Sequence, residues 1–276
     1  MRYLVTGGRG FIGGHLVDRL VADGHDVLAL DDSRSGNNHN DEAAYIFCDI
    51  SKYKEIEHYF DGVDGVFHTA AIARTKWCID DPSLCHRVNV NGTFNVLEAC
   101  RRLKVPRVVL SSSSIIYAAK TPYRASKEIL EIYAETYREM YGLSSVCLRY
   151  SNVYGPRQSE DGPSPNVLAA LRKTRKEEGI IRISGDGEQS RAYLHVRDVV
   201  EANILAMGSD CQGVIDITSE EILTLNQIAP YFDCPVVYVP EREGDVKIIK
   251  QDPSKAKEIL GWEAKIPFSV GIKEIV

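Results

Sequence analysis

Residues 6–13 read Thr6-Gly7-Gly8-Arg9-Gly10-Phe11-Ile12-Gly13, and this stretch decides the fold. It lies between an apolar, β-branched run, Tyr3–Thr6, and an amphipathic helical pattern that stops at Gly24. In a strand–loop–helix turn of this kind, the first glycine allows a tight bend, the middle one lets the backbone approach a pyrophosphate, and the last lets helix pack against strand. The helix N-terminus then faces the anion. The stretch therefore predicts a dinucleotide-binding βαβ unit.

The same unit carries an acidic residue where ribose binding needs one. Asp31 ends the second predicted strand, 18 residues after Gly13, and a carboxylate there can bind ribose hydroxyls. Asp31 and Asp32 would repel a 2′-phosphate, so the sequence favours NAD over NADP. Arg9 and Arg34 would argue the other way if either reached a phosphate, but solvated loop cations are the simpler interpretation.

Apolar runs alternate with helical patterns along the first 150 or so residues. Because the runs are continuously apolar, both faces of the sheet are expected to be covered, which favours a Rossmann-type α/β fold with a doubly wound parallel sheet. The predicted strands are Tyr3–Thr6, Val27–Leu30, Tyr45–Cys48, Val63–Thr69, Arg107–Ser112 and Ser145–Arg149. A helix is predicted from Pro82 to about Arg102, with Asp81 as its N-cap.

The alternation weakens near residue 154, where proline and glycine become frequent. We predict an NAD-binding domain over residues 1–153 and a smaller C-terminal α/β substrate-binding part over residues 154–276, with some chain crossing between the two. The smaller part is assigned the strands Val214–Thr218 and Val236–Val239 and a last helix, Pro253–Leu260.

Composition excludes several kinds of protein. The 276 residues include 33 Lys+Arg and 39 Asp+Glu, a formal net charge of -6, and 44% are hydrophobic. This is ordinary globular composition without a basic face, which argues against disorder and against nucleic-acid binding. The longest uncharged stretch, Val108–Ala119, has twelve residues, too few for a membrane span. No secretory signal is recognisable, so a cytoplasmic location is expected.

Cysteine and histidine usage points the same way. Seven cysteines without a Cys-x-x-Cys pair are typical of small buried hydrophobes in a reducing compartment. Seven histidines show no ligand spacing, so no metal site is predicted.

Tyr123 and Lys127 stand four residues apart at the start of a predicted helix, and so on one face of it. A cation beside a phenol favours the tyrosinate and lowers its pKa towards working pH. Ser111–Ser114 close the preceding strand at the edge where open α/β sheets bind ligands, so a serine hydroxyl can bond to a reacting alcohol or ketone. Alone, Tyr-x-x-x-Lys is common on helix surfaces, but beside a dinucleotide loop it indicates a catalytic pair.

With these features in place, the sequence resembles the extended short-chain dehydrogenase/reductase family, and within it the NAD-dependent nucleotide-sugar epimerases and dehydratases. The likeness covers nearly the whole chain and consists of many motifs in order. These are Thr6–Gly13, Phe67–Ala71, Asn89–Thr93, Ser111–Ser114, Pro122–Lys127, Leu148–Arg157, Gly185–Arg191 and Arg242–Asp245.

The resemblance implies roles for individual residues. Tyr123 would remove a sugar hydroxyl proton, Lys127 would hold the nicotinamide ribose and tune Tyr123, and Ser113 would bind the sugar oxygen. The diphosphate of the nucleotide sugar would lie against Asn152, Arg191 and Arg242, since guanidinium groups favour bidentate phosphate contacts. The implied NAD-binding residues are Gly7, Gly10, Phe11, Ile12, Gly13, Asp31, Asp49, Ile50, Ala70, Ala71, Asn89, Ser111, Tyr123, Lys127 and Tyr150. For Asp49, a helix N-cap is an equal alternative to an adenine contact.

Relatives of this kind begin by taking hydride from the sugar and differ in the later steps of the reaction. Dehydratases carry an Asp-Glu pair near the serine position and decarboxylases a glutamate, because these reactions need further acid–base groups. The stretch Ser113-Ser114-Ile115-Ile116 offers neither, so 4-epimerisation of a UDP-sugar is expected. An oxidoreductase or decarboxylase of the same fold, and a non-catalytic NAD-binding regulatory module, remain as alternatives.

Two departures from the family bear on the substrate. Five residues, 118–122, separate Tyr117 from Tyr123, whereas relatives carry a longer, proline-containing loop there that borders the sugar. Ser151 stands where relatives commonly have an aromatic residue. Arg74 and Lys76 could pair with a uronate carboxylate, or could be exposed loop charges.

The resemblance also implies assembly. The predicted helix with Tyr123 carries Ile129, Ile132, Tyr133, Thr136, Tyr137 and Met140 at helical spacing. Relatives pair this helix and the one before it between subunits, so a homodimer is expected.

Overall fold

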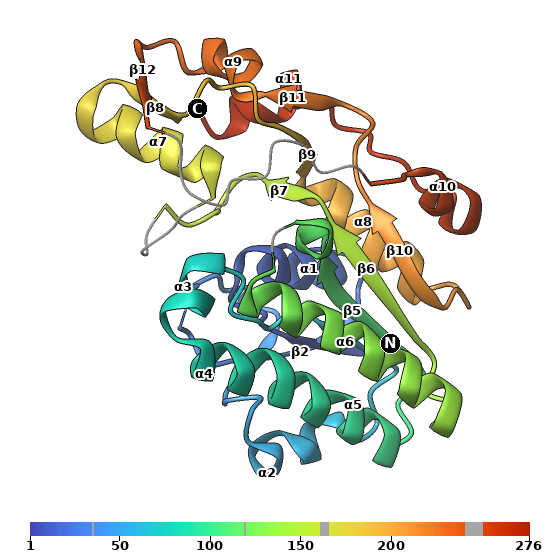
Figure 1. The fold of residues 1–276 in the computed structure, drawn as a ribbon. Helices are drawn as coiled ribbons and strands as arrows, with labels where there is room; N and C mark the ends of the chain where they lie inside the picture. The colour runs from blue at the N-terminus through green and yellow to red at the C-terminus, as the bar shows by residue number, and fades with distance from the viewer. Residues whose placement is uncertain (35, 119, 161–165, 241–250) are drawn as a thin grey trace.

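The computed structural model describes residues 1–34, 36–118, 120–160, 166–240 and 251–276. Seven parallel strands form its main sheet, in the order β10-β6-β5-β4-β1-β2-β3 (Figure 1). These strands are β1 (Arg2–Thr6), β2 (Asp26–Asp31), β3 (Ala44–Phe47), β4 (Gly65–His68), β5 (Val108–Ser113), β6 (Ser145–Tyr150) and β10 (Gly213–Ile217). The predicted Rossmann-type fold class is confirmed.

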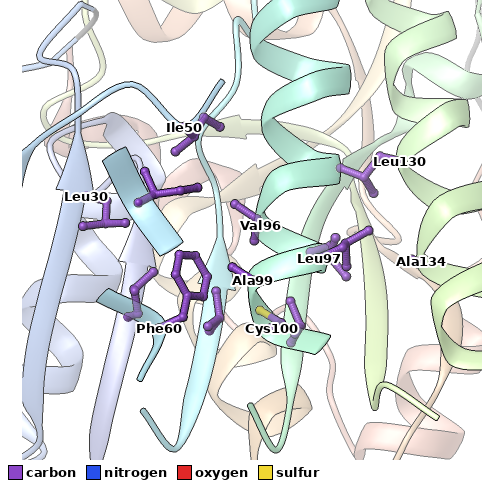
Figure 2. Packing of buried hydrophobic residues seen from close by; sticks show 14 of the residues in the cluster. Leu30, Ile50, Phe60, Val96, Leu97, Ala99, Cys100, Leu130 and Ala134 are labelled. Carbon is purple, nitrogen blue, oxygen red and sulfur yellow. The ribbon is translucent and has the colours of Figure 1, made fainter. Parts of the chain in front are cut away.

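Helices cover both faces of this sheet, as the apolar strands require. Successive residues of β1 face opposite ways: Leu4 joins one core cluster, whereas Val5 joins the other. Figure 2 shows part of the first cluster, including Leu30, Phe60 and Val96. The long helices are α1 (Phe11–Ala22) and α8 (Val196–Met207) on the second cluster, and α5 (Gly92–Arg102) and α6 (Pro122–Tyr141) on the first.

Short helical segments link the strands of the main sheet. They are α2 (Tyr53–Ile56), η1 (Glu57–Phe60), α3 (Thr75–Asp80), α4 (Pro82–Cys85), η2 (His86–Asn91) and η3 (Ser114–Tyr117). The helix predicted from Pro82 to Arg102 runs through α4, η2 and α5, with a π-helical turn in η2 that the sequence did not predict. Asp81 caps it as expected, since its carboxylate accepts a hydrogen bond from Leu84 N at 2.8 Å.

The chain after β6 builds smaller sheets beyond the carboxyl edge of the main one (Figure 1). Its strands are β7 (Asn152–Tyr154), β8 (Ile181–Ser184), β9 (Ser190–His195), β11 (Ile222–Thr224) and β12 (Val236–Val239), paired as β11-β9-β7 and β12-β8. Its helices are α7 (Val167–Glu178), α9 (Leu225–Ile228), η4 (Ala229–Phe232), α10 (Ser254–Leu260), α11 (Phe268–Gly271) and η5 (Ile272–Glu274). A separate apolar cluster, including Tyr154, Phe232 and Phe268, holds this part together.

Two segments assigned to the smaller part belong elsewhere. The predicted strand Val214–Thr218 is β10, which pairs in parallel with β6 and completes the main sheet. The helix predicted over Pro253–Leu260 is α10, whose Ala256 packs with Trp262 into the core on the α8 face of that sheet. The assignment was wrong because a strand's partner is set by tertiary pairing and not by its local pattern. The division after residue 153 stays a prediction.

No helix in the described part of the chain is long and apolar enough to cross a membrane. Among the same residues, no group of three or more His, Cys, Asp or Glu side chains is placed to hold a metal ion. The cysteines are free thiols and all except Cys234 are buried, as expected for small hydrophobes.

Candidate active site

The glycine loop after β1 makes contacts that leave no room for a side chain at Gly7 or Gly13. Gly7 has a φ of +73°, and a Cβ added there would lie 2.8 Å from the backbone of Ala70. A Cβ on Gly13 would lie 2.0 Å from the carbonyl oxygen of Gly7. The loop is therefore as tight as the motif predicted, and α1 begins directly after Gly10.

A cavity of about 1200 Å³ opens from this loop along the carboxyl edge of the main sheet. It joins the glycine loop and Asp31 at one end to Ser113 and Tyr123. The predicted site residues that line it are Gly7, Gly10, Phe11, Ile12, Gly13, Asp31, Ile50, Ala70, Ala71, Ser113, Tyr123, Tyr150, Asn152 and Arg191. One cavity thus brings together residues from the glycine loop, β2, β5, α6 and β9, where open α/β sheets bind ligands.

Lys127, Ser111 and Asn89 lie behind the cavity wall. The Lys127 ammonium donates a hydrogen bond to the carbonyl oxygen of Ser111 at 2.7 Å, which fixes α6 to the end of β5. Asn89 Oδ1 accepts a hydrogen bond from Ile72 N at 2.7 Å. Asn89 Nδ2 donates to Ile72 O and to Ser126 Oγ, each at 3.1 Å. Asn89 therefore ties the segment after β4 to the first turns of α6, and so supports the side of the cavity that carries Ala70 and Ala71.

Tyr123 and Lys127 are both buried, and burial dominates their ionisation. Desolvation raises the pKa of Tyr123 to about 12 and lowers the pKa of Lys127 to about 8. The expected lowering of the Tyr123 pKa by Lys127 is therefore wrong. The Lys127 Nζ lies 5.9 Å from the centre of the tyrosine ring, and the groups that do lower the Tyr123 pKa are Ser113 and the Arg74 guanidinium.

Sequence comparisons agree with this geometry. Residues 3–217 match the model of the NAD-dependent epimerase/dehydratase family. The chain belongs to this family. A UDP-glucose 4-epimerase of Mycolicibacterium smegmatis is 33% identical over 311 aligned positions, which cover 100% of this chain and 97% of that protein. Because this chain has 276 residues, the relative carries segments that it lacks.

Two solved structures are similar over the whole chain. The UDP-glucose 4-epimerase of Thermotoga maritima with UDP-glucose has a TM-score of 0.95 at 34% identity, covering 100% of this chain and 97% of that one. The UDP-glucose 4-epimerase of Thermus thermophilus in complex with NAD has a TM-score of 0.91 at 33% identity, with the same coverage.

The family cofactor, NAD, fits the residues around the glycine loop. Asp31 Oδ2 accepts a hydrogen bond from Arg9 N at 2.9 Å, and burial raises the pKa of this carboxyl. The two arginines considered for a 2′-phosphate are engaged elsewhere: Arg34 pairs with Asp32 at 3.0 Å, and the Arg9 guanidinium lies 4.7 Å from the centre of the Tyr45 ring. A ribose with free hydroxyls therefore suits this end of the cavity.

Other predicted residues differ in their placement. Asp49 does not line the cavity, and its carboxylate accepts from Ser51 N at 2.9 Å in a local turn. Ser151 lines it, and its hydroxyl has no hydrogen-bond partner among the described residues. Arg242 lies outside the described residues. Ala118 and Thr121, two residues of the short segment before Tyr123, line the cavity.

The sequence did not predict a network of side chains that connects β5, the strand with the serines, to α6. Glu131 accepts hydrogen bonds from Ser112 Oγ at 2.6 Å and from the Arg149 guanidinium at 2.6 and 2.8 Å. Arg149 also donates to Tyr117 OH at 2.6 Å, and Tyr117 OH donates to Asp216 at 3.1 Å. We call these five residues the Glu131 clasp. The signal was available, because Glu131 follows Lys127 by four residues on one helix face.

Proposed function

We propose that this chain is an NAD-dependent nucleotide-sugar 4-epimerase that acts on UDP-sugars. The observation that carries the proposal is one cavity lined by the dinucleotide loop, Asp31, Ser113 and Tyr123, with Lys127 fixed directly behind. The residues after the serines, Ile115 and Ile116, provide no carboxylic acid for elimination of water.

In this proposal each residue acts at a defined atom. NAD would be held by the glycine loop and Asp31, and it would supply the acceptor, and later the donor, for the hydride of sugar carbon 4. Tyr123 removes the proton of the hydroxyl on that carbon and later gives it back, and Ser113 hydrogen-bonds the same oxygen. Lys127 holds the strand end that carries the serines through its bond to Ser111. Asn152 and Arg191, both in the cavity wall, bind the diphosphate.

Inversion requires the 4-keto sugar to present its other face before the hydride returns. The cavity of about 1200 Å³ is lined by the glycine loop and Asp31 as well as by Ser113 and Tyr123, so it would hold both NAD and the nucleotide sugar. The sugar would turn at the end that Ser113 and Tyr123 line.

We further propose that the protein is a homodimer through α5 and α6. Large apolar side chains lie exposed along these helices: Ile132 is 61% and Met140 70% accessible on α6, and Phe94 is 40% accessible on α5. Figure 1 shows the two helices side by side on the outside of the sheet. Apolar surface of this kind is typical of a protein–protein contact.

Conversion of UDP-galactose to UDP-glucose by the purified chain, resolved by chromatography, tests the proposed activity. Tyr123→Phe removes the proton-transfer group but keeps the ring, so turnover is expected to fall about 100-fold or more. Tyr133→Phe, on the same helix but outside the cavity, is the matched control and should keep activity. Turnover that survives Tyr123→Phe would contradict the assignment, and free NADH accumulating without an epimer would favour a net oxidoreductase.

A further inference from the structure

Arg74 lines the cavity and has no acidic partner among the residues that the structure describes. It ends the segment that leaves β4 and directly precedes α3. Its Nη2 lies 3.4 Å from the carbonyl oxygen of Ser159, a long hydrogen bond, and no carboxylate of a described residue pairs with it. By contrast, Arg34 and Arg157 in the same wall are neutralised by aspartates at 3.0 and 2.7 Å. A cation in this position favours an anionic ligand group.

Geometry places Arg74 at the reacting end of the site, because Arg74 and Tyr123 line the same cavity and α3, which Arg74 precedes, packs against α6, which carries Tyr123. Burial lowers the pKa of Arg74, and Arg74 and Tyr123 shift each other's pKa through their charges. Arg74 therefore lies near the phenol that the proposed function assigns to carbon 4 of the sugar. In a pyranose ring, carbon 4 lies opposite carbon 1, which carries the diphosphate. Carbon 6, by contrast, is attached to carbon 5, the direct neighbour of carbon 4.

We propose that the substrate is a nucleotide-diphosphate hexuronate and that Arg74 binds its carbon 6 carboxylate. The inference rests on the proposed function, because both place carbon 4 at Tyr123. A planar guanidinium matches a carboxylate with two parallel hydrogen bonds. A neutral sugar presents a hydroxymethyl group instead and would leave the charge of Arg74 unpaired.

The neighbouring cation does not share this role. Lys76 Nζ binds both carboxylate oxygens of Asp80, at 2.7 and 2.9 Å, one helical turn away on α3. Its side chain is 56% exposed, and Lys76 is not part of the cavity wall. The sequence offered both Arg74 and Lys76 as partners for a uronate. In the structure Arg74 lines the cavity, whereas Lys76 lies on the surface. Lys76 therefore provides a matched control.

The test measures binding and turnover of UDP-glucuronate and UDP-glucose by the full chain. We expect calorimetry to give at least about tenfold tighter binding of the uronate. In Arg74→Gln, the ratio of uronate to neutral-sugar kcat/KM should fall about 30-fold or more, the cost of truncating one partner of a buried charge pair. Arg74→Lys should recover part of this ratio, whereas Lys76→Gln should leave it unchanged. Circular dichroism shows whether each variant is folded.

The possible outcomes separate the two proposals. Interconversion of UDP-glucose and UDP-galactose, with neither binding nor turnover of UDP-glucuronate, overturns the uronate inference and leaves the proposed function intact. Conversion of UDP-glucuronate to a UDP-pentose and carbon dioxide supports the uronate inference and overturns the 4-epimerase. If no sugar turns over, the proposed function fails, and the calorimetric comparison of wild type with Arg74→Gln still decides the inference. An unchanged ratio in folded Arg74→Gln overturns the role of Arg74.

Discussion

At the scale of single residues, Lys127 is a functional group whose burial lowers the free energy of unfolding. It is almost fully buried and has its hydrogen bond to Ser111 as compensation. Burial lowers its pKa from 10.5 to about 8. The unfolded chain therefore holds this proton more tightly than the folded one. Its contribution to stability rises with pH between about 8 and 10.5 and is unfavourable below that window.

Lys127→Met is expected to stabilise the protein while it abolishes function. At pH 7 the desolvation cost, roughly 3 kcal/mol, is removed, and the lost bond to Ser111 offsets about 1 kcal/mol. The free energy of unfolding should therefore rise by on the order of 2 kcal/mol, and turnover should fall about 100-fold or more. Urea titrations at pH 7 and pH 10 check the sign, because the gain must shrink at the higher pH. The exposed Lys265→Met is the control, and an equal gain at both pH values would contradict the burial argument.

Residue-level prediction succeeded where the requirement is local. The Gly7 and Gly13 positions admit no Cβ, so the motif alone identifies them. The sequence could not separate Arg74 from Lys76, because their directions depend on where α3 begins. Thr75 opens that helix, and Lys76 then meets Asp80 one turn along. The pKa of Tyr123 was mispredicted for a related reason, since burial is a property of the packed site.

At the scale of elements, the Glu131 clasp sets the position of α6 on the sheet. Tyr123, Lys127 and Glu131 occupy successive turns of α6, and the last two are bonded to β5. Through Arg149 and Tyr117 the clasp also reaches β6 and η3, beside the short segment that precedes Tyr123. The spacing of Tyr123 from the serines therefore depends on a group that is not in the cavity wall.

Glu131→Gln should disturb the spacing of Tyr123 from the serines of β5. The ion pair with Arg149 is largely buried, with side-chain exposures of 10% and 20%, so its loss is expected to cost about 2 to 4 kcal/mol of stability. We expect kcat to fall about tenfold or more with a small change in KM, because Glu131 touches no substrate. Glu128→Gln, which removes the more exposed pair with Arg124 on the same helix, should cost under about 1 kcal/mol. Equal effects of the two variants on kcat would argue against a positioning role.

The sequence predicted the strands themselves, but it did not predict the pairing of strands that lie far apart in the chain. Short apolar runs between turn residues marked the strands from β1 to β6, because all of them except the edge strand β3 are largely buried. β10 was recognised as a strand and put in the wrong sheet, since its partner β6 lies more than 60 residues earlier in the chain. The π-helical turn of η2 has no local signal, and yet it carries Asn89, which secures the cavity wall.

At the scale of the whole molecule, α5 and α6 carry aromatic side chains that contact one another, together with exposed apolar side chains. Phe94 contacts Tyr133 edge to face at 5.7 Å between ring centres, and Tyr137 contacts Tyr141 in the same way at 5.2 Å. Ile132 and Met140 extend this apolar surface on α6. In the proposed homodimer these side chains are buried between subunits, which would remove apolar surface from water.

The double variant Ile132→Glu/Met140→Glu should be monomeric. Each glutamate would place a charge without a partner in the proposed interface, so dissociation is expected to be favoured by about 100-fold or more for the pair. Light scattering after gel filtration at micromolar concentration should give a dimer mass for the wild type and half of it for the variant. Phe47→Glu, which changes an apolar side chain 78% exposed on the edge strand β3, should stay dimeric. A monomeric wild type would contradict the proposed assembly.

The same variant also tells whether the active site needs the dimer. Ser126, Lys127 and the Glu131 clasp hold the Tyr123 segment in place through contacts within the chain itself. We therefore expect the monomeric variant to retain epimerase turnover within several-fold of the wild type while unfolding at a lower temperature, because subunit binding stabilises the folded state by mass action. A complete loss of turnover in a folded monomer would instead mean that the α6 position depends on the partner.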